Sequence, residues 1–317
     1  MTQTTKELIE GMLLYKESIG RKRATYEIHL HGIAEYIDEK CKTGEIISLK
    51  EVIIPWCERR ETESASGLRR RLAAVREFTK YLYANDKCDG ILSLDELPAA
   101  APFTPYIFTD DELMAIFHEA EHIDSDPEDL FSKNVLGLIF KLIYFCGLRP
   151  NEGRELQRID FDSKEGTLFI RHNKSGRERI IPIEDELAML CERYLKERDI
   201  LYPSSDMFFP STNGKAYSAK WLGRRFMKIW RMAFPDSKAQ VRVYDLRHRF
   251  ATAVMTGWLE KGENLYTCLP YLSAYMGHAE FSSTAYYIHL LPERLMKSSS
   301  INWELFSDIL PEVENYE

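Results

Sequence analysis

Apolar residues recur at intervals of three and four along the first 85 residues, and no stretch there alternates with a period of two. The clearest case is the segment 67–85, where Leu68, Leu72, Val75, Phe78 and Leu82 form one stripe. This spacing predicts an amphipathic helix that buries one face in a core. We therefore expect residues 1–88 to form a small, purely helical domain.

The pattern breaks at residues 89–106, which carry Gly90, Pro98, Pro102 and Pro105 and little periodicity. Such a stretch is typical of a linker between domains. A second domain, 107–317, then opens at Thr109. Together with Glu112, three residues later, Thr109 forms the signature of a capping box at a helix start, with Ile107 placed to pack beside it.

An almost wholly apolar run, 134–146, predicts a buried helix that ends at Gly147, a residue suited to the position after a helix. Pro150 favours the first turn of a new helix, which we expect to span 150–159. Arg149 therefore lies in a corner between two helices, where its side chain can be held rigidly.

The period changes to two at residues 167–172 and 177–183, which flank Asn173-Lys174-Ser175-Gly176. This predicts a β-hairpin with Lys174 in its turn. Helices resume near Glu184, Ser218 and Asp245, and an apolar stripe from Trp303 to Leu310 predicts a short C-terminal helix. The fold class expected is mainly α with a small β-hairpin (α+β), in two domains.

The net charge of −8 argues at first against a nucleic-acid partner, because phosphate binding is largely electrostatic. However, the segment 110–129 holds nine acidic residues and no Lys or Arg, which more than accounts for the imbalance. Basic residues cluster at 69–71, 171–179 and 224–249. Charge therefore does not exclude DNA as the partner.

The six cysteines and eight histidines are scattered without the spacing of a metal site, so we expect no metal and no cofactor. No apolar run is long enough to cross a bilayer, and the first residues lack the pattern of a signal peptide. These features predict a cytoplasmic protein with no membrane partner.

Basic side chains outside the apolar stripes are candidate contacts to the DNA backbone. Arg69, Arg76 and Lys80 share a second face of the helix 67–85, and Arg177 and Arg179 follow the hairpin turn. For each group, an ordinary solvated surface is the alternative interpretation.

Five motifs in the second domain occur in a fixed order: Gly-Leu-Arg-x-x-Glu at 147–152, the hairpin Lys174, Tyr244-Asp-Leu-Arg247-His, Gly277-His278, and Tyr287 nine residues after His278. In this order the chain resembles the tyrosine recombinase (phage integrase) family over roughly residues 108–292. The helical first domain is similar to that family's core-binding (SAM-like) domain. The long insertion between the Arg247 motif and His278 is similar to transposon-borne members.

The resemblance implies a site-specific recombinase that cuts and rejoins DNA through a 3′-phosphotyrosine. Tyr287 would be the nucleophile, Arg149, Arg247 and His278 would hold the phosphate, and Lys174 would protonate the leaving oxygen. These assignments agree with the chemistry of the residues, because a phosphodiester under attack needs positioned cations and a phenol needs a cationic environment to ionise. Tyr244 stands where the family usually has His, and a phenol mainly donates a hydrogen bond rather than accepting a proton.

The resemblance also implies a homotetramer on two duplex recombination sites, with the C-terminal helix docked on a neighbouring subunit. Packing of that helix on its own domain is the alternative. Three other functions remain open at this point: a type IB topoisomerase, a non-catalytic DNA-binding homologue, and a helical interaction protein that binds no DNA.

Overall fold

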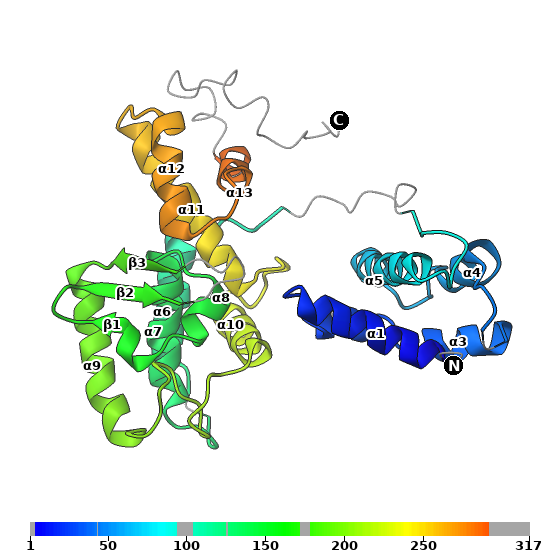
Figure 1. Cartoon of the computed structure of the whole chain (residues 1–317). Coiled ribbons are helices and arrows are strands. Elements are labelled where there is room, and N and C mark those ends of the chain that lie inside the picture. Colours follow the sequence, from blue (N-terminus) through cyan, green and yellow to red (C-terminus); the bar gives the residue numbers. More distant parts are fainter. Residues whose placement is uncertain (1–3, 43, 94–103, 125, 172–177, 292–317) are drawn as a thin grey trace. The chain divides into compact units, whose positions relative to one another are not determined.

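The computed structural model describes residues 4–42, 44–93, 104–124, 126–171 and 178–291 (Figure 1). The chain divides into two compact units, Met1–Phe103 and Thr104–Glu317. Each unit has a hydrophobic core of its own. The described elements are helices and one small sheet, which confirms the α+β class.

The first unit is entirely helical in its named elements: α1 (Thr5–Ser18), α2 (Ala24–Glu27), α3 (Ile33–Lys40), the π-helical turn η1 (Leu49–Ile53), α4 (Ile54–Trp56) and α5 (Ala65–Ala84). Helix α5 buries Leu72, Val75, Phe78 and Leu82 in the core, while Leu68 is partly buried at its edge. The apolar stripe thus confirms the helix and the face that it buries.

Packing in the first unit continues beyond residue 88, where we expected the domain to end. Ile47 and Cys88 form an isolated parallel bridge. The backbone N–H of Leu92 donates to Thr79 Oγ1 over 3.1 Å, and the Leu92 side chain joins the core. The start of the expected linker is therefore part of the helical unit.

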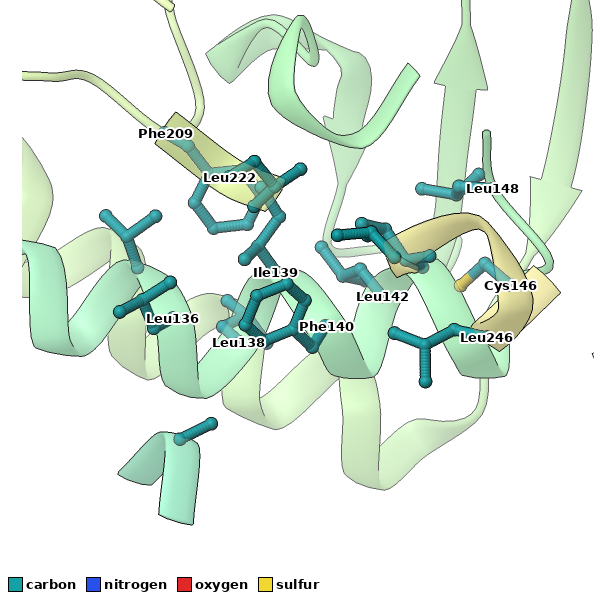
Figure 2. Close-up of a cluster of buried hydrophobic side chains, with 14 of the residues drawn as sticks. Leu136, Leu138, Ile139, Phe140, Leu142, Cys146, Leu148, Phe209, Leu222 and Leu246 are labelled. Atoms are coloured by element: carbon teal, nitrogen blue, oxygen red, sulfur yellow. The ribbon is translucent and has the colours of Figure 1, made fainter. Parts of the chain in front are cut away.

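The second unit contains α6 (Asp110–His122), α7 (Ser132–Phe145), α8 (Pro150–Arg154), η2 (Arg158–Asp160), α9 (Asp185–Leu201), α10 (Ala219–Ala233), α11 (Val243–Glu260), α12 (Leu265–Met276), α13 (Ser282–Ala285) and η3 (Tyr286–Leu290); η2 and η3 are 3-10 turns. Helix α7 is the centre of its core. Figure 2 shows Leu136, Phe140 and Leu142 of α7 among side chains from α10 and α11.

The capping box at the start of α6 is present. The Thr109 backbone N–H donates to Glu112 Oε2 over 2.8 Å, and the Glu112 N–H donates to Thr109 Oγ1 over 3.2 Å. The apolar residue packed beside the box is Phe108, which is 1% exposed, rather than the expected Ile107, which is only partly buried. Phe108 directly precedes the cap, and this places its ring toward the core.

The end of α7 fixes the corner that holds Arg149. The N–H of Leu148 donates to Ile143 O over 3.0 Å, and the N–H of Gly147 donates to Tyr144 O over 3.1 Å. Gly147 has φ +56°, and a Cβ added there would lie 2.5 Å from Phe250 Cδ1 of α11. Both the left-handed turn and the close approach therefore require glycine.

Helix α8 starts at Pro150 as expected but ends at Arg154, well short of residue 159. The Gln157 N–H instead donates to Asp160 Oδ2 over 2.8 Å, which turns the chain into η2. A side chain that accepts from the backbone three residues earlier competes with helix continuation. The expected long helix is therefore wrong beyond its first turns.

The sheet is antiparallel in the order β1 (Phe161–Asp162), β2 (Thr167–Ile170), β3 (Arg179–Pro182). Leu168 pairs with Ile181 and Ile170 with Arg179. The two strands predicted for the hairpin are confirmed. Its turn, with Lys174 and Arg177, lies outside the described residues, as does the segment 292–317 with the expected C-terminal helix. Among the helices that the structure describes, none is both long and apolar enough to cross a membrane.

Candidate active site

Arg149 is the residue before the first turn of α8, and its side chain is 19% exposed. Its Nη1 donates to Glu152 Oε1 over 2.7 Å, and its Nη2 donates to Gly277 O over 2.9 Å. Glu152 Oε2 also accepts the Arg149 backbone N–H over 2.9 Å. The guanidinium is thus held on two sides by groups from α8 and from the end of α12.

Arg247, in the second turn of α11, is fully buried. Its Nη1 donates to Gly147 O over 2.5 Å, and its Nη2 donates to Met276 O over 2.8 Å and lies 3.0 Å from His278 Nε2. Burial lowers the pKa of Arg247, and the nearby Tyr244 and Tyr287 oppose this shift. The Arg247 Nε is buried without a hydrogen-bond partner among the described residues.

His278 follows Gly277, which ends α12 in the left-handed conformation. His278 Nδ1 lies 2.7 Å from Thr284 Oγ1 of α13. Because arginine can only donate, Nε2 accepts from Arg247 and the proton sits on Nδ1, which donates to Thr284. Burial, followed by the charges of Arg247 and Arg149, lowers the pKa of His278 to about 3. The imidazole is therefore neutral at physiological pH.

Tyr287 lies in η3 and is 2% exposed. Its ring is stacked on that of His278, with centroids 6.2 Å apart and planes at 19°, and it packs in a core cluster with Met255 and Met276. Burial raises the pKa of Tyr287 to about 12, although the charge of Arg247 acts in the opposite direction. In this state the phenol is protonated and shielded.

Tyr244 lies one turn before His248 on the same helix, with ring centroids 5.0 Å apart. The His248 ring in turn lies 5.5 Å from that of Tyr287. The His248 ring is therefore a neighbour of both Tyr244 and the candidate nucleophile. Burial, with the charges of Arg242 and Arg247, lowers the pKa of His248 to about 4, so this imidazole is neutral as well.

Glu152 links the cations of this cluster. Besides Arg149, it accepts from both terminal nitrogens of Arg179, over 3.1 Å to Oε1 and 2.8 Å to Oε2, and Arg247 Nη1 lies 3.8 Å away. Burial alone would raise the pKa of this carboxyl, but the hydrogen bonds and charge of Arg179 outweigh it and hold the pKa at about 2. Glu152 is thus the anion around which the arginines are arranged.

The lowered pKa of Glu152 makes stability depend on pH. A carboxyl whose pKa falls from 4.5 to about 2 on folding stabilises the protein above pH 4.5, and this stabilisation is lost as the pH drops toward 2. This shift contributes about 3 kcal/mol to the free energy of unfolding. We expect Glu152→Gln to flatten the decline between pH 5 and 2.5 in urea-unfolding midpoints. Glu186→Gln, which removes an exposed carboxylate of α9, should leave the slope unchanged.

Arg179 requires a correction. We expected it to contact the DNA backbone, but its side chain is 8% exposed, and it is bound to Glu152 and, through Nε, to Tyr275 O over 2.7 Å. The alternating pattern of residues 177–183 predicted the strand that holds Arg179. It could not show that the Arg179 side chain faces a buried carboxylate. The sequence interpretation also missed Thr284, whose hydroxyl orients His278 and whose position carries no local signal.

The candidate contacts of the first unit lie on α5. Arg69 and Lys80 are exposed, and Lys80 is paired with Glu77 over 2.8 Å. Arg76 is partly buried and lines a concavity of about 450 Å³ together with Arg70 and His29. Arg70 was not among the residues expected to contact DNA, although it adds a second guanidinium to the same surface.

Helix α10 carries a basic face that sequence reasoning noted only as a local excess of charge. Its buried side consists of Leu222, Phe226, Ile229 and Trp230. The opposite side lines an open concavity of about 660 Å³ and includes Lys220, Arg224, Lys228 and Arg231. The spacing of these cations, four, four and three, was a signal that could have identified the face.

No group of His, Cys, Asp and Glu side chains suited to a metal ion occurs in the described part of the chain. The candidate site is instead a cluster of arginines, a neutral imidazole and a phenol. Such cations can stabilise the spreading negative charge of a phosphodiester under attack.

Comparisons with known proteins agree with this chemistry. Residues 107–294 match the model of the phage integrase family. The putative integrase/recombinase y4rE of Sinorhizobium fredii is 31% identical over 228 residues, which cover 71% of this chain and 73% of that protein. The tyrosine recombinase XerD of Rhizobium meliloti is 24% identical over 233 residues, covering 73% and 72%.

Solved structures share the fold. The recombinase XerH, in a post-cleavage complex with its palindromic difH substrate, matches with a TM-score of 0.67 at 21% identity, covering 89% of this chain and 80% of that one. The Tn1549 transposon integrase bound to transposon right-end DNA matches with a TM-score of 0.61 at 16% identity, covering 88% and 94%.

The protein is thus of the tyrosine recombinase class, the enzymes that the family model and these relatives represent. Specifically, the chain belongs to the phage integrase family and is a site-specific DNA recombinase.

Proposed function

We propose that the protein cuts and rejoins duplex DNA through a 3′-phosphotyrosine formed on Tyr287. The observation that carries this proposal is the direct contact of Arg247 with His278, on whose ring Tyr287 is stacked. Arg149 joins the same cluster through Gly277, the neighbour of His278. Two guanidiniums and an imidazole are thereby gathered next to the candidate nucleophile.

Arg149 and Arg247 would bind the non-bridging oxygens of the scissile phosphate. A planar guanidinium offers several donors and a permanent charge. Arg247 Nε is a buried donor without a partner among the described residues, so a phosphate oxygen would satisfy it. His278 would donate a further hydrogen bond once Arg247 turns toward the phosphate and the ring proton moves to Nε2, with Thr284 Oγ1 then donating to Nδ1.

In the proposed reaction the phenolic oxygen of Tyr287 attacks phosphorus and the bond to the 5′-oxygen breaks. The products are a 3′-phosphotyrosine and a 5′-hydroxyl. The phenol loses its proton to solvent or to a neighbouring base, and the leaving oxygen gains one from Lys174, whose assignment rests on its place in the hairpin sequence. Attack by a 5′-hydroxyl of another strand reverses the step and releases Tyr287.

Tyr244 would donate a hydrogen bond to the phosphate rather than accept the proton of Tyr287. Attack also requires that η3 move, because Tyr287 is 2% exposed in the described state. Cationic groups around a bound phosphate would then favour the phenolate that burial now opposes.

We place the DNA interface of the second unit on the basic face of α10 and that of the first unit on the Arg70 and Arg76 concavity of α5. Both surfaces present cations beside a hollow of the molecule, which suits the phosphate backbone.

The α10 interface predicts a change in salt dependence. Replacing Lys220, Arg224, Lys228 and Arg231 by Gln should lower the slope of log affinity against log salt by about 0.9 for each phosphate that is no longer neutralised. Fluorescence anisotropy with duplex DNA between 50 and 200 mM salt measures it. Lys196→Gln, on the exposed side of α9, is the control and should not alter the slope. An unchanged slope in the quadruple variant would place the interface elsewhere.

We further propose that the protein acts in the cytoplasm on a mobile element, as a homotetramer on two recombination sites, with the helix expected from the sequence of its C-terminal segment docked on a neighbour. Support comes from the similarity to the Tn1549 transposon integrase and to a λ integrase dimer bound to a COC′ core site. Cross-linking with and without paired sites would reveal the assembly.

The test of the reaction is formation of a covalent adduct. Radiolabelled duplexes from the DNA flanking the gene, nicked beside each candidate site, trap the 3′-phosphotyrosine because the short 5′-product diffuses away. We expect an adduct that survives denaturation. Specific binding without any adduct would favour a non-catalytic homologue, and relaxation of supercoils by a monomer without a specific site would favour a topoisomerase.

A further inference from the structure

Three successive carbonyls at the end of α12 each accept a hydrogen bond from a different arginine. Arg179 Nε donates to Tyr275 O over 2.7 Å, Arg247 Nη2 to Met276 O over 2.8 Å, and Arg149 Nη2 to Gly277 O over 2.9 Å. The last carbonyls of a helix lack partners within the helix and carry the negative end of its dipole. This turn therefore collects the cations that the proposed reaction uses, together with one that it does not use.

The additional cation is Arg179 of β3. Each of its three guanidinium nitrogens donates a hydrogen bond within the protein. Both terminal nitrogens bind Glu152, and Nε binds the carbonyl of Tyr275 at the end of α12. With 8% of its side chain exposed, Arg179 is not placed to touch DNA. Instead it bridges α12 to the carboxylate that orients Arg149.

Formal charges show what this bridge changes. Arg149, Arg247 and Arg179 with Glu152 sum to +2 (three cations less one anion), whereas without Arg179 the sum is +1. Without Arg179, Glu152 would keep only Arg149 as a close partner and could draw Arg247, whose Nη1 is already 3.8 Å away, into a closer ion pair. Arg179 offsets the charge of the carboxylate, so that the cluster as a whole keeps a net positive charge for a phosphate.

We propose that Arg179 is a positioning residue for strand cleavage, which saturates Glu152 and anchors the end of α12 so that Arg149 and Arg247 stay aligned on the phosphate. The proposal rests on the function proposed above. It assigns Arg179 no contact with DNA and no proton transfer.

The test compares Arg179→Lys with Arg198→Lys. Arg198 is a matched control in the same unit: it is 2% exposed and donates to Met207 O and to Asp199, away from the cluster. Both variants should lose similar thermal stability. At saturating protein and a temperature where both are folded, Arg179→Lys should form adduct about 10- to 100-fold more slowly, as for residues that orient an active-site ligand. Arg198→Lys should stay within about twofold of wild type, and DNA affinity should be unchanged in both.

A double-mutant cycle tests whether Arg179 acts through Arg149. If it does, Arg179→Lys should slow Arg149→Lys by a smaller factor than it slows wild type, because one of the two guanidiniums that Arg179 aligns is already absent. Effects that multiply would overturn the proposal, as would an Arg179→Lys rate equal to that of wild type.

A second measurement tests the role of Arg179 even if the protein does not cleave DNA. If wild type never forms an adduct, orthovanadate, a tetrahedral oxyanion, is titrated calorimetrically into wild type and both variants. Binding at least about fivefold weaker in Arg179→Lys than in Arg198→Lys would support the positioning role. Equal affinities, or no vanadate binding by wild type, would overturn it.

Discussion

Tyr287→Phe is expected to form no covalent adduct with DNA while binding it as tightly as wild type. The substitution removes only the phenolic oxygen, and loss of a nucleophile costs on the order of 10⁶ in rate in enzymes that depend on one. The ring stays in its core cluster with Met255 and Met276, so the fold should be kept. Nicked labelled substrates and denaturing electrophoresis measure the adduct, and anisotropy measures the affinity.

Tyr286→Phe is the matched control for this experiment. Tyr286 is adjacent, only partly buried, and 6.1 Å from Tyr287 between ring centroids. It should retain adduct formation. An adduct that persists in Tyr287→Phe and disappears in Tyr286→Phe would transfer the nucleophile to the neighbouring residue.

Arg247→Lys should reduce cleavage by about 10³-fold or more, the scale of a missing arginine in phosphoryl transfer. It should also lower the melting temperature. One ammonium cannot replace a fork that spans Gly147 O on one segment and Met276 O and His278 on another. Single-turnover adduct formation and calorimetry measure the two effects.

Comparing the loss of cleavage with the loss of melting temperature shows whether Arg247 acts in the reaction or only stabilises the fold. Arg198→Lys provides the comparison, since Arg198 is equally buried and also bound to backbone carbonyls. If both variants lose stability but only Arg247→Lys loses cleavage, Arg247 acts on the phosphate. Equal losses of cleavage would mean that the rate follows stability alone.

Local patterns in the sequence predicted the elements well. The apolar stripe of α5, the capping box of α6 and the alternation of β2 and β3 each depend on residues a few positions apart, and each is present in the structure. The length of α8 was wrong because the chain after Arg154 finds other partners: Asp160 accepts from Gln157, and the backbone of Leu156 and Arg158 pairs with Phe208 and Asp206. Such bonds to distant residues leave no periodic trace.

The arrangement around the site was harder to predict because it depends on distant pairs. Motif order placed Arg149, Arg247, His278 and Tyr287 in one family pattern, and the structure brings these four together. The order of the motifs could not reveal that Arg179 binds Glu152, 27 positions earlier in the chain. Nor could it reveal that Thr284 fixes the position of the proton on His278. The tertiary fold decides which charged side chains form a buried ion pair. A charged residue in a strand sequence indicates by itself only that the residue is exposed.

The contacts of His278 have a consequence for fidelity. Arg247 donates to one ring nitrogen, and the other donates to Thr284, three residues before Tyr287. A phosphate that draws Arg247 away would remove the hydrogen bond to His278 Nε2. Without this bond, the turn that holds Thr284 and buries the phenol of Tyr287 would be less firmly anchored. Recognition of a complete phosphodiester and unmasking of the nucleophile would then be one event, so an ill-fitting strand that fails to engage Arg247 would meet an enzyme with no exposed nucleophile.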